Sequence, residues 1–369
     1  MRVMKKIASI HHLRGIASLG VLLFHAFAFV SGYGNDWIPA DLTRIGEAGV
    51  DIFFVISGFI LTVAVRRAPG RTAFVLGRLA RVGGPYWAVV IGIAAMTLAA
   101  PTAFRSFTWA PHDLVLSLAF VPSILRDGSI FPLLEPGWTL SLEMLFYLLL
   151  AVALGLPARL RSVLICLALV LLAATGWLLD LPQGESLAWF YTQAVLVEFG
   201  FGVVIAELYL AGWRADRHQA LAALIFGGLG LALAAGDPPD AFERARLWCY
   251  GVPAALIVGG ALFLEAAGKW RAHAVLSWLG DISYSLYLTH VLVVATTVKL
   301  LAGRVGMFGD SGGDVVLLAM ALAAAFAAAT LFYRAVEQPS LRLASRVQKR
   351  RNHPRNNAML QDGIIRHIQ

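Results

Sequence analysis

The sequence has little charge for its size. Only 14% of its 369 residues are Asp, Glu, Lys or Arg, whereas 59% are apolar, and its mean hydropathy is +0.73. A soluble domain typically has about 25% charged residues. This composition excludes a disordered chain, which needs low hydrophobicity and high charge, and it argues against a soluble globular enzyme. We expect a bilayer to be the solvent for most of this chain.

Cysteine is also scarce. Cys166 and Cys249 are the only two, which excludes a disulfide-rich scaffold. Both lie in apolar runs without metal-ligand spacing, so we interpret them as packing thiols and expect no metal site. The first apolar run contains Arg14 and His25 and has no clear cleavage site, so we do not expect a cleavable signal peptide. The sequence shows no internal repeat and no polar stretch long enough for a separate soluble domain.

Long apolar runs dominate what is present. A helix needs about 20 mostly apolar residues to cross a hydrocarbon core of about 30 Å. A shorter apolar piece, residues 114–124, lies between prolines and is expected to re-enter the membrane or lie at its surface. The pattern predicts an all-α polytopic membrane protein with about ten transmembrane helices, at roughly 10–30, 45–65, 84–101, 138–156, 161–179, 187–210, 219–236, 247–266, 281–302 and 314–334.

The net charge of +8 is distributed asymmetrically. If the N-terminus is cytoplasmic, most of the 30 Lys and Arg residues fall in cytoplasmic segments, as the positive-inside rule requires. We therefore expect both termini in the cytoplasm. Residues 1–343 are predicted to form one membrane domain, and residues 344–369 a basic, disordered tail that can touch anionic lipid. Tryptophans near the ends of the spans, Trp138 and Trp189 among them, are interpreted as an interfacial aromatic belt.

Three ionisable residues are predicted to lie at a similar depth in different spans. His25 follows Arg14 by eleven residues, or about 16 Å of helix, which carries it past the midplane. Asp51 and Glu143 lie a few residues inside the outer ends of their own spans. A histidine oriented by an acidic partner is a typical general base, and ionisable residues within spans are costly and mark function. The alternative is a set of satisfied interhelical hydrogen bonds.

A second polar group is basic and predicted to be cytoplasmic. Arg78 and Arg81 are three residues apart, so they share one helical face, and arginine forks suit phosphate groups. The alternative is that these charges only determine topology. Ser57 and Gly58 interrupt the second apolar run, where a small pair permits close helix approach or access by a ligand.

Six segments resemble the acyltransferase-3 family of integral membrane O-acyltransferases, and together they cover roughly residues 9–343. One departure concerns Glu143, which is followed by Met144 where the family often has a second acid, so the resemblance supports one acidic role there. The matching segments are Leu13–His25, Gly49–Leu61, Arg78–Pro85, Trp138–Leu149, Ile282–His290 and Val336–Pro339.

The resemblance implies transfer of an acyl group, usually acetyl, from a cytoplasmic acyl-CoA to a hydroxyl of an extracytoplasmic carbohydrate or glycolipid. It implies a bacterial inner-membrane enzyme that uses acyl-CoA as a substrate, with no permanently bound cofactor and no nucleic-acid partner. The main alternative is a proton-coupled transporter that uses the same buried groups. Acceptor identity, acyl chain length and oligomeric state stay open.

The resemblance also suggests roles for individual residues. His25 would act as general base or transient acyl carrier, and either Asp51 or Glu143 would orient its ring. Arg14 would bind the donor or stabilise developing charge. The residues expected to bind the donor are Arg14, Ser57, Arg78 and Arg81, and the other candidates are Tyr284, His290 and Glu337.

Overall fold

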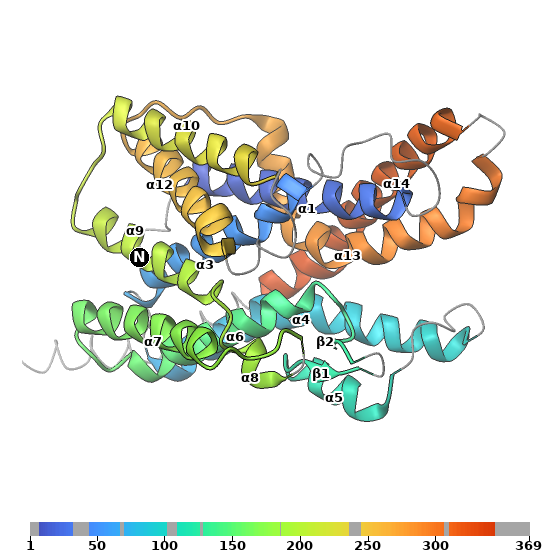
Figure 1. The fold of residues 1–369 in the computed structure, drawn as a ribbon, viewed down its shortest axis with the longest axis horizontal. Coiled ribbons are helices and arrows are strands. Elements are labelled where there is room, and N and C mark those ends of the chain that lie inside the picture. Colours follow the sequence, from blue (N-terminus) through green and yellow to red (C-terminus); the bar gives the residue numbers. More distant parts are fainter. Residues whose placement is uncertain are drawn as a thin grey trace, which may run out of the picture.

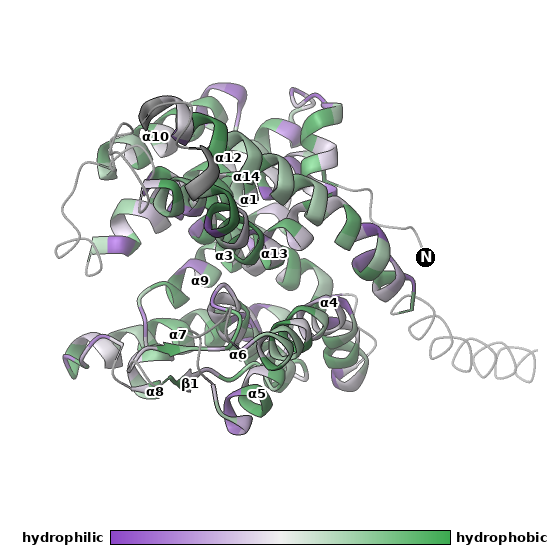
Figure 2. Cartoon of the chain, turned by 90° about the vertical axis from the view of Figure 1, so that its right-hand side faces the viewer, coloured by the Kyte–Doolittle hydropathy of each residue, from purple (hydrophilic) through white to green (hydrophobic). Residues whose placement is uncertain are grey.

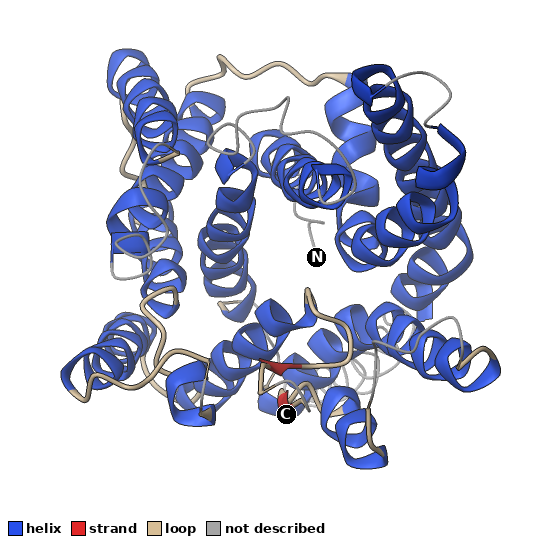
Figure 3. Ribbon diagram, turned by 45° about the vertical axis from the view of Figure 1, so that its right-hand side comes forward, coloured by secondary structure: helices blue, strands red, loops and turns tan. Residues whose placement is uncertain are grey.

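The computed structural model describes residues 7–31, 44–66, 70–101, 109–125, 128–184, 186–235, 245–305 and 310–343. The predicted basic tail, residues 344–369, lies outside these ranges, as do parts of the loops between spans. The described chain is almost entirely helical, with one two-stranded antiparallel ribbon that pairs β1, Ser123–Ile124, with β2, Ile130–Phe131 (Figure 3). The predicted all-α class is confirmed for this part of the chain.

The helices follow the apolar runs of the sequence. Short 3-10 or π segments join some of them: η1, Ile45–Ala48; η2, Leu247–Gly251; and η4, Tyr333–Glu337. The α-helices are α1, Ala8–Ser31; α3, Gly49–Val65; α4, Arg71–Ala99; α5, Pro111–Leu118; α6, Gly137–Ala153; α7, Ala158–Leu178; α8, Leu187–Phe190; α9, Leu196–Leu210; α10, Arg217–Ala234; α12, Val252–Ala266; α13, Ala274–Val305; and α14, Asp310–Phe332.

Eight helices in the described ranges are long and apolar enough to cross a membrane. Each of the ten predicted stretches contains a helix, but α6 has 17 residues and α9 has 15. At 1.5 Å per residue these two helices extend about 25 and 22 Å, less than a full hydrocarbon core. The expectation of about ten spans is therefore confirmed only as eight long helices. The predicted sidedness of the termini stays a prediction.

The predicted re-entrant piece, residues 114–124, consists of the end of α5, a turn and β1. Because α5 has only eight residues, it extends about 12 Å and cannot cross a bilayer. The indole Nε1 of Trp87 on α4 donates to the carbonyl of Leu118, at 2.8 Å, which attaches the end of α5 to α4. Hydrophobic residues run along most of the helices, and hydrophilic ones gather mainly near helix ends and loops (Figure 2).

The helices form two groups, which both ribbon views separate (Figures 1 and 2). One contains α1, α3, α10, α12, α13 and α14, and the other contains α4, α5, α6, α7 and α8. Helix α9 packs against both α3 and α7 and so joins the groups. Contacts of α4 with α13 and of α3 with α6 also cross between them. Helix α3 belongs to the first group and contacts α6 of the second, so its polar candidates lie near the boundary between the groups.

Glycine makes the contact between α3 and α9 possible. A Cβ at Gly58 would lie 2.1 Å from the carbonyl oxygen of Phe199, and one at Gly202 would lie 2.1 Å from that of Val55. No side chain fits at such distances, so the two backbones touch directly, as small residues allow between membrane helices. Gly58 therefore accounts for helix packing, and it fixes the position of the neighbouring Ser57.

Candidate active site

A pocket of about 120 Å³ lies between the two groups of helices, with lining residues from α1, α3, α4, α6, α13 and η4. We call it the arginine pocket. It brings together seven of the ten residues singled out from the sequence, which came from six separate segments. They are Arg14, Ser57, Arg78, Arg81, Glu143, Tyr284 and Glu337.

Three guanidinium groups meet in the arginine pocket. Arg78 and Arg81 share a face of α4, as their spacing predicts, and Arg14 on α1 is close enough to Arg81 for the two charges to interact. Within the described ranges, none of the three guanidiniums makes a hydrogen bond or an ion pair. Arg78 instead lies over the ring of Phe74, 5.8 Å from its centroid. Clustered guanidiniums without bonded carboxylates are suited to binding an anion.

The two carboxylates of the arginine pocket are bonded to hydroxyl groups. Glu143 accepts hydrogen bonds from Ser57 Oγ, at 3.1 Å, and from Tyr147 OH, at 2.9 Å. Glu337 accepts from the backbone N–H of Ser285, at 3.1 Å, and from its Oγ, at 2.5 Å. These bonds hold both acids in place without neutralising the arginines. Sequence reasoning missed Tyr147 and Ser285, although Tyr147 is four residues after Glu143 and so shares its helical face.

His25 and His290 form a contact between α1 and α13. The Nε2 atom of His290 lies 3.3 Å from the Nδ1 atom of His25, and the ring centroids are 4.9 Å apart. His25 Nδ1 also lies 2.9 Å from the carbonyl oxygen of Val21. The ring of His290 is in turn 5.9 Å from that of Tyr287, which lines the arginine pocket. The polar neighbours of His25 are therefore a carbonyl and a second imidazole.

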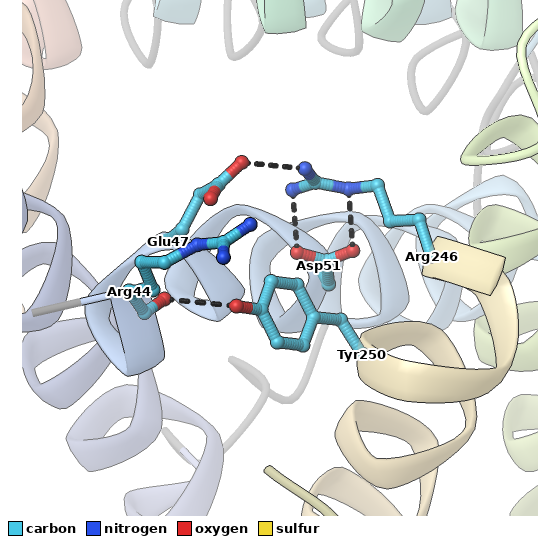
Figure 4. Close-up of polar contacts among 5 residues, drawn as sticks. All are labelled: Arg44, Glu47, Asp51, Arg246 and Tyr250. Carbon is cyan, nitrogen blue, oxygen red and sulfur yellow. Dashed lines mark hydrogen bonds and ion pairs between the residues drawn. The ribbon is translucent and has the colours of Figure 1, made fainter. Parts of the chain in front are cut away.

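The geometry corrects the expected orienting role of the acids. Asp51 accepts two hydrogen bonds from Arg246, at 3.1 Å from Nε and 2.9 Å from Nη2, and Arg246 Nη1 also bonds Glu47, at 2.7 Å (Figure 4). Glu143 belongs to the arginine pocket. Neither acid holds His25 in the described structure. A buried carboxylate gains more from a bidentate guanidinium than from a neutral imidazole, which accounts for the choice of partner.

Arg246 is a residue that sequence reasoning counted only as a charge in an outer loop. It lies at the start of η2, and its guanidinium reaches the first turn of α3 (Figure 4). On the next turn of η2, Tyr250 OH donates to the backbone carbonyl of Arg44, at 3.1 Å (Figure 4). Since Asp51 is fully buried, this pairing gives its charge a compensating partner. No spacing within the sequence could have indicated a contact between residues 195 positions apart.

A second, larger cavity of about 880 Å³ lies beside His25. We call it the tryptophan cavity, after Trp138, Trp177 and Trp189, which line it. Its polar lining includes Glu47, Glu135, Gln193 and Arg246. Trp138 and Trp189 had been interpreted as an interfacial belt, and the structure places both at this cavity. Val50 lines both cavities, so they adjoin at α3.

The chain matches the sequence model of the acyltransferase-3 family, described as an acyltransferase domain, over residues 7–334. It is 35% identical over 259 residues to the exopolysaccharide production protein ExoZ of Rhizobium meliloti, covering 69% of this chain and 78% of that protein. It is 28% identical over 371 residues to the acyltransferase MdmB of Streptomyces mycarofaciens, covering 92% and 93%. It is 25% identical over 380 residues to nodulation protein 10 of Rhizobium leguminosarum, covering 92% and 94%. No solved structure gives a significant match.

The family match spans most of the chain and includes the α-helices that line the two cavities, whereas Glu337 of η4 lies just beyond it. None of these comparisons supports the transporter alternative. Eight apolar helices in the described ranges make the chain a multi-pass membrane protein. Together, these findings identify the chain as a membrane-embedded enzyme that belongs to the acyltransferase-3 family.

Proposed function

We propose that this enzyme moves an acyl group, typically acetyl, from a cytoplasmic acyl-CoA to a hydroxyl of an extracytoplasmic carbohydrate or glycolipid. The observation that carries the proposal is the set of three guanidiniums without bonded carboxylates in the arginine pocket. This pocket adjoins the cavity that His25 lines, at Val50. One side of α3 thus suits an anionic donor, and the other suits a hydroxyl acceptor.

The arginine pocket supports binding of the phosphate groups of the donor. Coenzyme A carries several phosphate charges, which arginine forks bind well. A pocket of about 120 Å³ is too small for a whole coenzyme, since sites for drug-sized ligands run from about 300 Å³. We therefore place a phosphate group of the donor against Arg78 and Arg81 inside the pocket, and the rest of the nucleotide outside it. Arg14 would bind the donor or stabilise the charge that develops on the acyl oxygen.

His25 supplies the base in the proposed reaction. In direct transfer, the acceptor oxygen bonds to the acyl carbon while the carbon–sulfur bond breaks, and His25 takes the hydroxyl proton and returns it to the departing thiolate. In the two-step variant, a nitrogen of His25 first accepts the acyl group and then passes it to the hydroxyl. Both routes yield an ester and free thiol.

The tryptophan cavity is the proposed acceptor site. Its volume of about 880 Å³ suits a ligand of one to a few sugar units. Indole rings offer flat apolar surfaces, and Glu135 and Gln193 offer hydrogen-bond groups, which together suit a hydroxyl-rich ring. The name of the relative ExoZ, an exopolysaccharide production protein, supports a polysaccharide or its precursor as the acceptor class. The bacterial inner membrane is the compartment that fits such a reaction.

The test uses the full chain in detergent with labelled acetyl-CoA and a panel of glycan acceptors. We expect acceptor-dependent loss of the thioester and labelled ester on the glycan. We expect His25→Ala to abolish turnover while the protein stays folded. Appreciable transfer by His25→Ala would contradict the base assignment. Proton-coupled uptake into liposomes without thioester turnover would instead favour the transporter.

A further inference from the structure

The imidazole pair of α1 and α13 has a hydrogen-bond arrangement that permits only certain proton positions. His290 is fully buried, and its Nδ1 lies 3.1 Å from the carbonyl oxygen of Leu286 and 2.8 Å from that of Tyr287. A carbonyl oxygen can only accept a hydrogen bond, so His290 Nδ1 must carry the proton. In a neutral imidazole the other nitrogen is then an acceptor. His290 therefore presents an unprotonated Nε2 toward His25.

The same reasoning applies to His25. Its Nδ1 lies 2.9 Å from the carbonyl oxygen of Val21 and 3.3 Å from Nε2 of His290. Both neighbours are acceptors, so His25 Nδ1 carries a proton that the two share. The remaining nitrogen of His25, Nε2, then has a free lone pair. Within the described part of the chain Nε2 has no hydrogen-bond partner, and His25 lines the tryptophan cavity.

We propose that His290 is a positioning residue that holds His25 in the tautomer with a basic Nε2. This inference rests on the proposed function for its catalytic meaning. It assigns to a neutral imidazole the part that an acid plays in a Ser-His-Asp triad. When His25 takes the hydroxyl proton on Nε2, both of its nitrogens carry protons, and the bond from Nδ1–H to His290 strengthens because its donor is now charged.

A neutral partner is consistent with the surroundings of this pair. Asp51 and Glu143 are the acids that were predicted at a depth similar to that of His25. Asp51 bonds Arg246, and Glu143 bonds Ser57 and Tyr147. His290 is therefore the side chain that bonds the ring of His25 in the described structure.

The test compares two replacements of His290 in the full chain. His290→Gln offers a side-chain carbonyl that can accept from Nδ1–H, whereas His290→Leu fills similar space without an acceptor. We expect kcat for acyl transfer to fall at least about a hundredfold in His290→Leu, the lower range for loss of a general base. We expect much of that loss to be recovered in His290→Gln, with the KM for acetyl-CoA unchanged in both.

A direct readout does not depend on activity. Nitrogen-15 NMR of histidine-labelled protein in detergent reports which ring nitrogen is protonated, with the His25 signals identified from their loss in His25→Gln. We expect the proton on Nδ1 in the wild type and a partial shift to the Nε2 tautomer in His290→Leu, in which Nδ1–H keeps the Val21 carbonyl but loses its second acceptor. His12→Gln is the matched control, because His12 is also buried on α1 and bonds Ser277 and Trp270. Its kcat should stay near that of the wild type.

Three results would overturn the inference. These are a wild-type His25 protonated on Nε2, a His290→Leu variant with unchanged tautomer and kcat, and equal losses in the Leu and Gln variants. If the wild type turned over no acyl-CoA at all, the proposed function would fail, but the NMR result would still decide whether His290 sets the tautomer. The two failures are therefore distinguishable.

Discussion

The first turn and the middle of α3 lie beside charges that are held in opposite ways. At the first turn of α3, the carboxylates of Asp51 and Glu47 both accept hydrogen bonds from Arg246, at 3.1 Å or less. Near Ser57, the three guanidiniums of the arginine pocket meet two carboxylates that bond hydroxyl groups instead. A paired ion stabilises the fold, whereas an unpaired one costs free energy unless a ligand completes it. The first turn of α3 therefore holds a structural ion pair, and the arginine pocket holds cations that an anionic ligand would complete.

The largest effect on stability is expected from breaking the ion pair between Arg246 and Asp51. Arg246→Leu leaves Asp51 buried without a cation, so the free energy of unfolding should fall by about 3–5 kcal/mol. Denaturant unfolding in mild detergent measures it. Arg66→Leu is the control, because Arg66 pairs with Glu207 where both side chains are about 30% exposed, and such pairs contribute about 0.2–1 kcal/mol. Similar losses in the two variants would remove the distinction between buried and exposed pairs.

Removing a positive charge from the arginine pocket should affect the binding of acetyl-CoA more than the stability of the fold. Arg78→Ala and Arg81→Ala each delete a charge-assisted contact worth about 1.5–3 kcal/mol. The Kd for acetyl-CoA should therefore rise by roughly tenfold to a hundredfold, with little loss of stability. Titration calorimetry measures the affinity. Arg159→Ala removes an exposed positive charge on α7 outside both cavities and should leave the affinity unchanged. Unaltered donor affinity in both pocket variants would rule out a phosphate-binding role.

A third prediction concerns Gly58, which follows Ser57 in the middle of α3. Gly58→Ala inserts a methyl group where the carbonyl of Phe199 lies 2.1 Å away, so α3 and α9 must separate. Overpacking of this kind typically costs about 1–3 kcal/mol. Gly92→Ala on α4 is the matched control, because nothing lies within 4 Å of its Cβ position. We expect Gly58→Ala to lower the unfolding free energy and Gly92→Ala to leave it equal or slightly higher. The reverse order would exclude direct backbone contact.

The smallest effect is expected at Glu198, a fully buried carboxyl beside Asp51. Within the described part of the chain, neither carboxyl oxygen of Glu198 has a hydrogen-bond partner. Glu198→Gln keeps the shape and supplies a donor, so stability should change by less than about 1 kcal/mol. A loss as large as that expected for Arg246→Leu would show that Glu198 acts as a charged member of the pair. Unfolding of both variants under identical conditions makes the comparison.

Much of the fold could be predicted because the length of each apolar run is visible in the sequence. Every predicted stretch contains a helix. What hydrophobicity cannot report is where a helix stops within an apolar run. The stretch 187–210 is divided into α8 and α9, and α6 has only 17 residues. Both shortened helices pack against α7, and that packing is tertiary information.

The candidate site was partly predictable for a related reason. Position along a span gives depth, and depth grouped His25, Asp51 and Glu143, whereas the structure places Glu143 in the arginine pocket with Arg14 and Arg78. Depth does not give the direction in which a side chain points around its helix axis. Asp51 bonds Arg246, whereas the sequence analysis expected it to orient His25. A long arginine that reaches in from another segment could not be inferred from the periodicity of α3.

Val50 lies where the arginine pocket and the tryptophan cavity adjoin. Its aliphatic side chain lines both cavities. An apolar partition excludes hydrated ions and protons, since placing charge in such surroundings is costly. A thioester end is slender and uncharged, so it can approach the opposite face where a hydrated cation cannot. Under the proposed function, acyl transfer past Val50 would open no path for the ions whose gradients the membrane maintains.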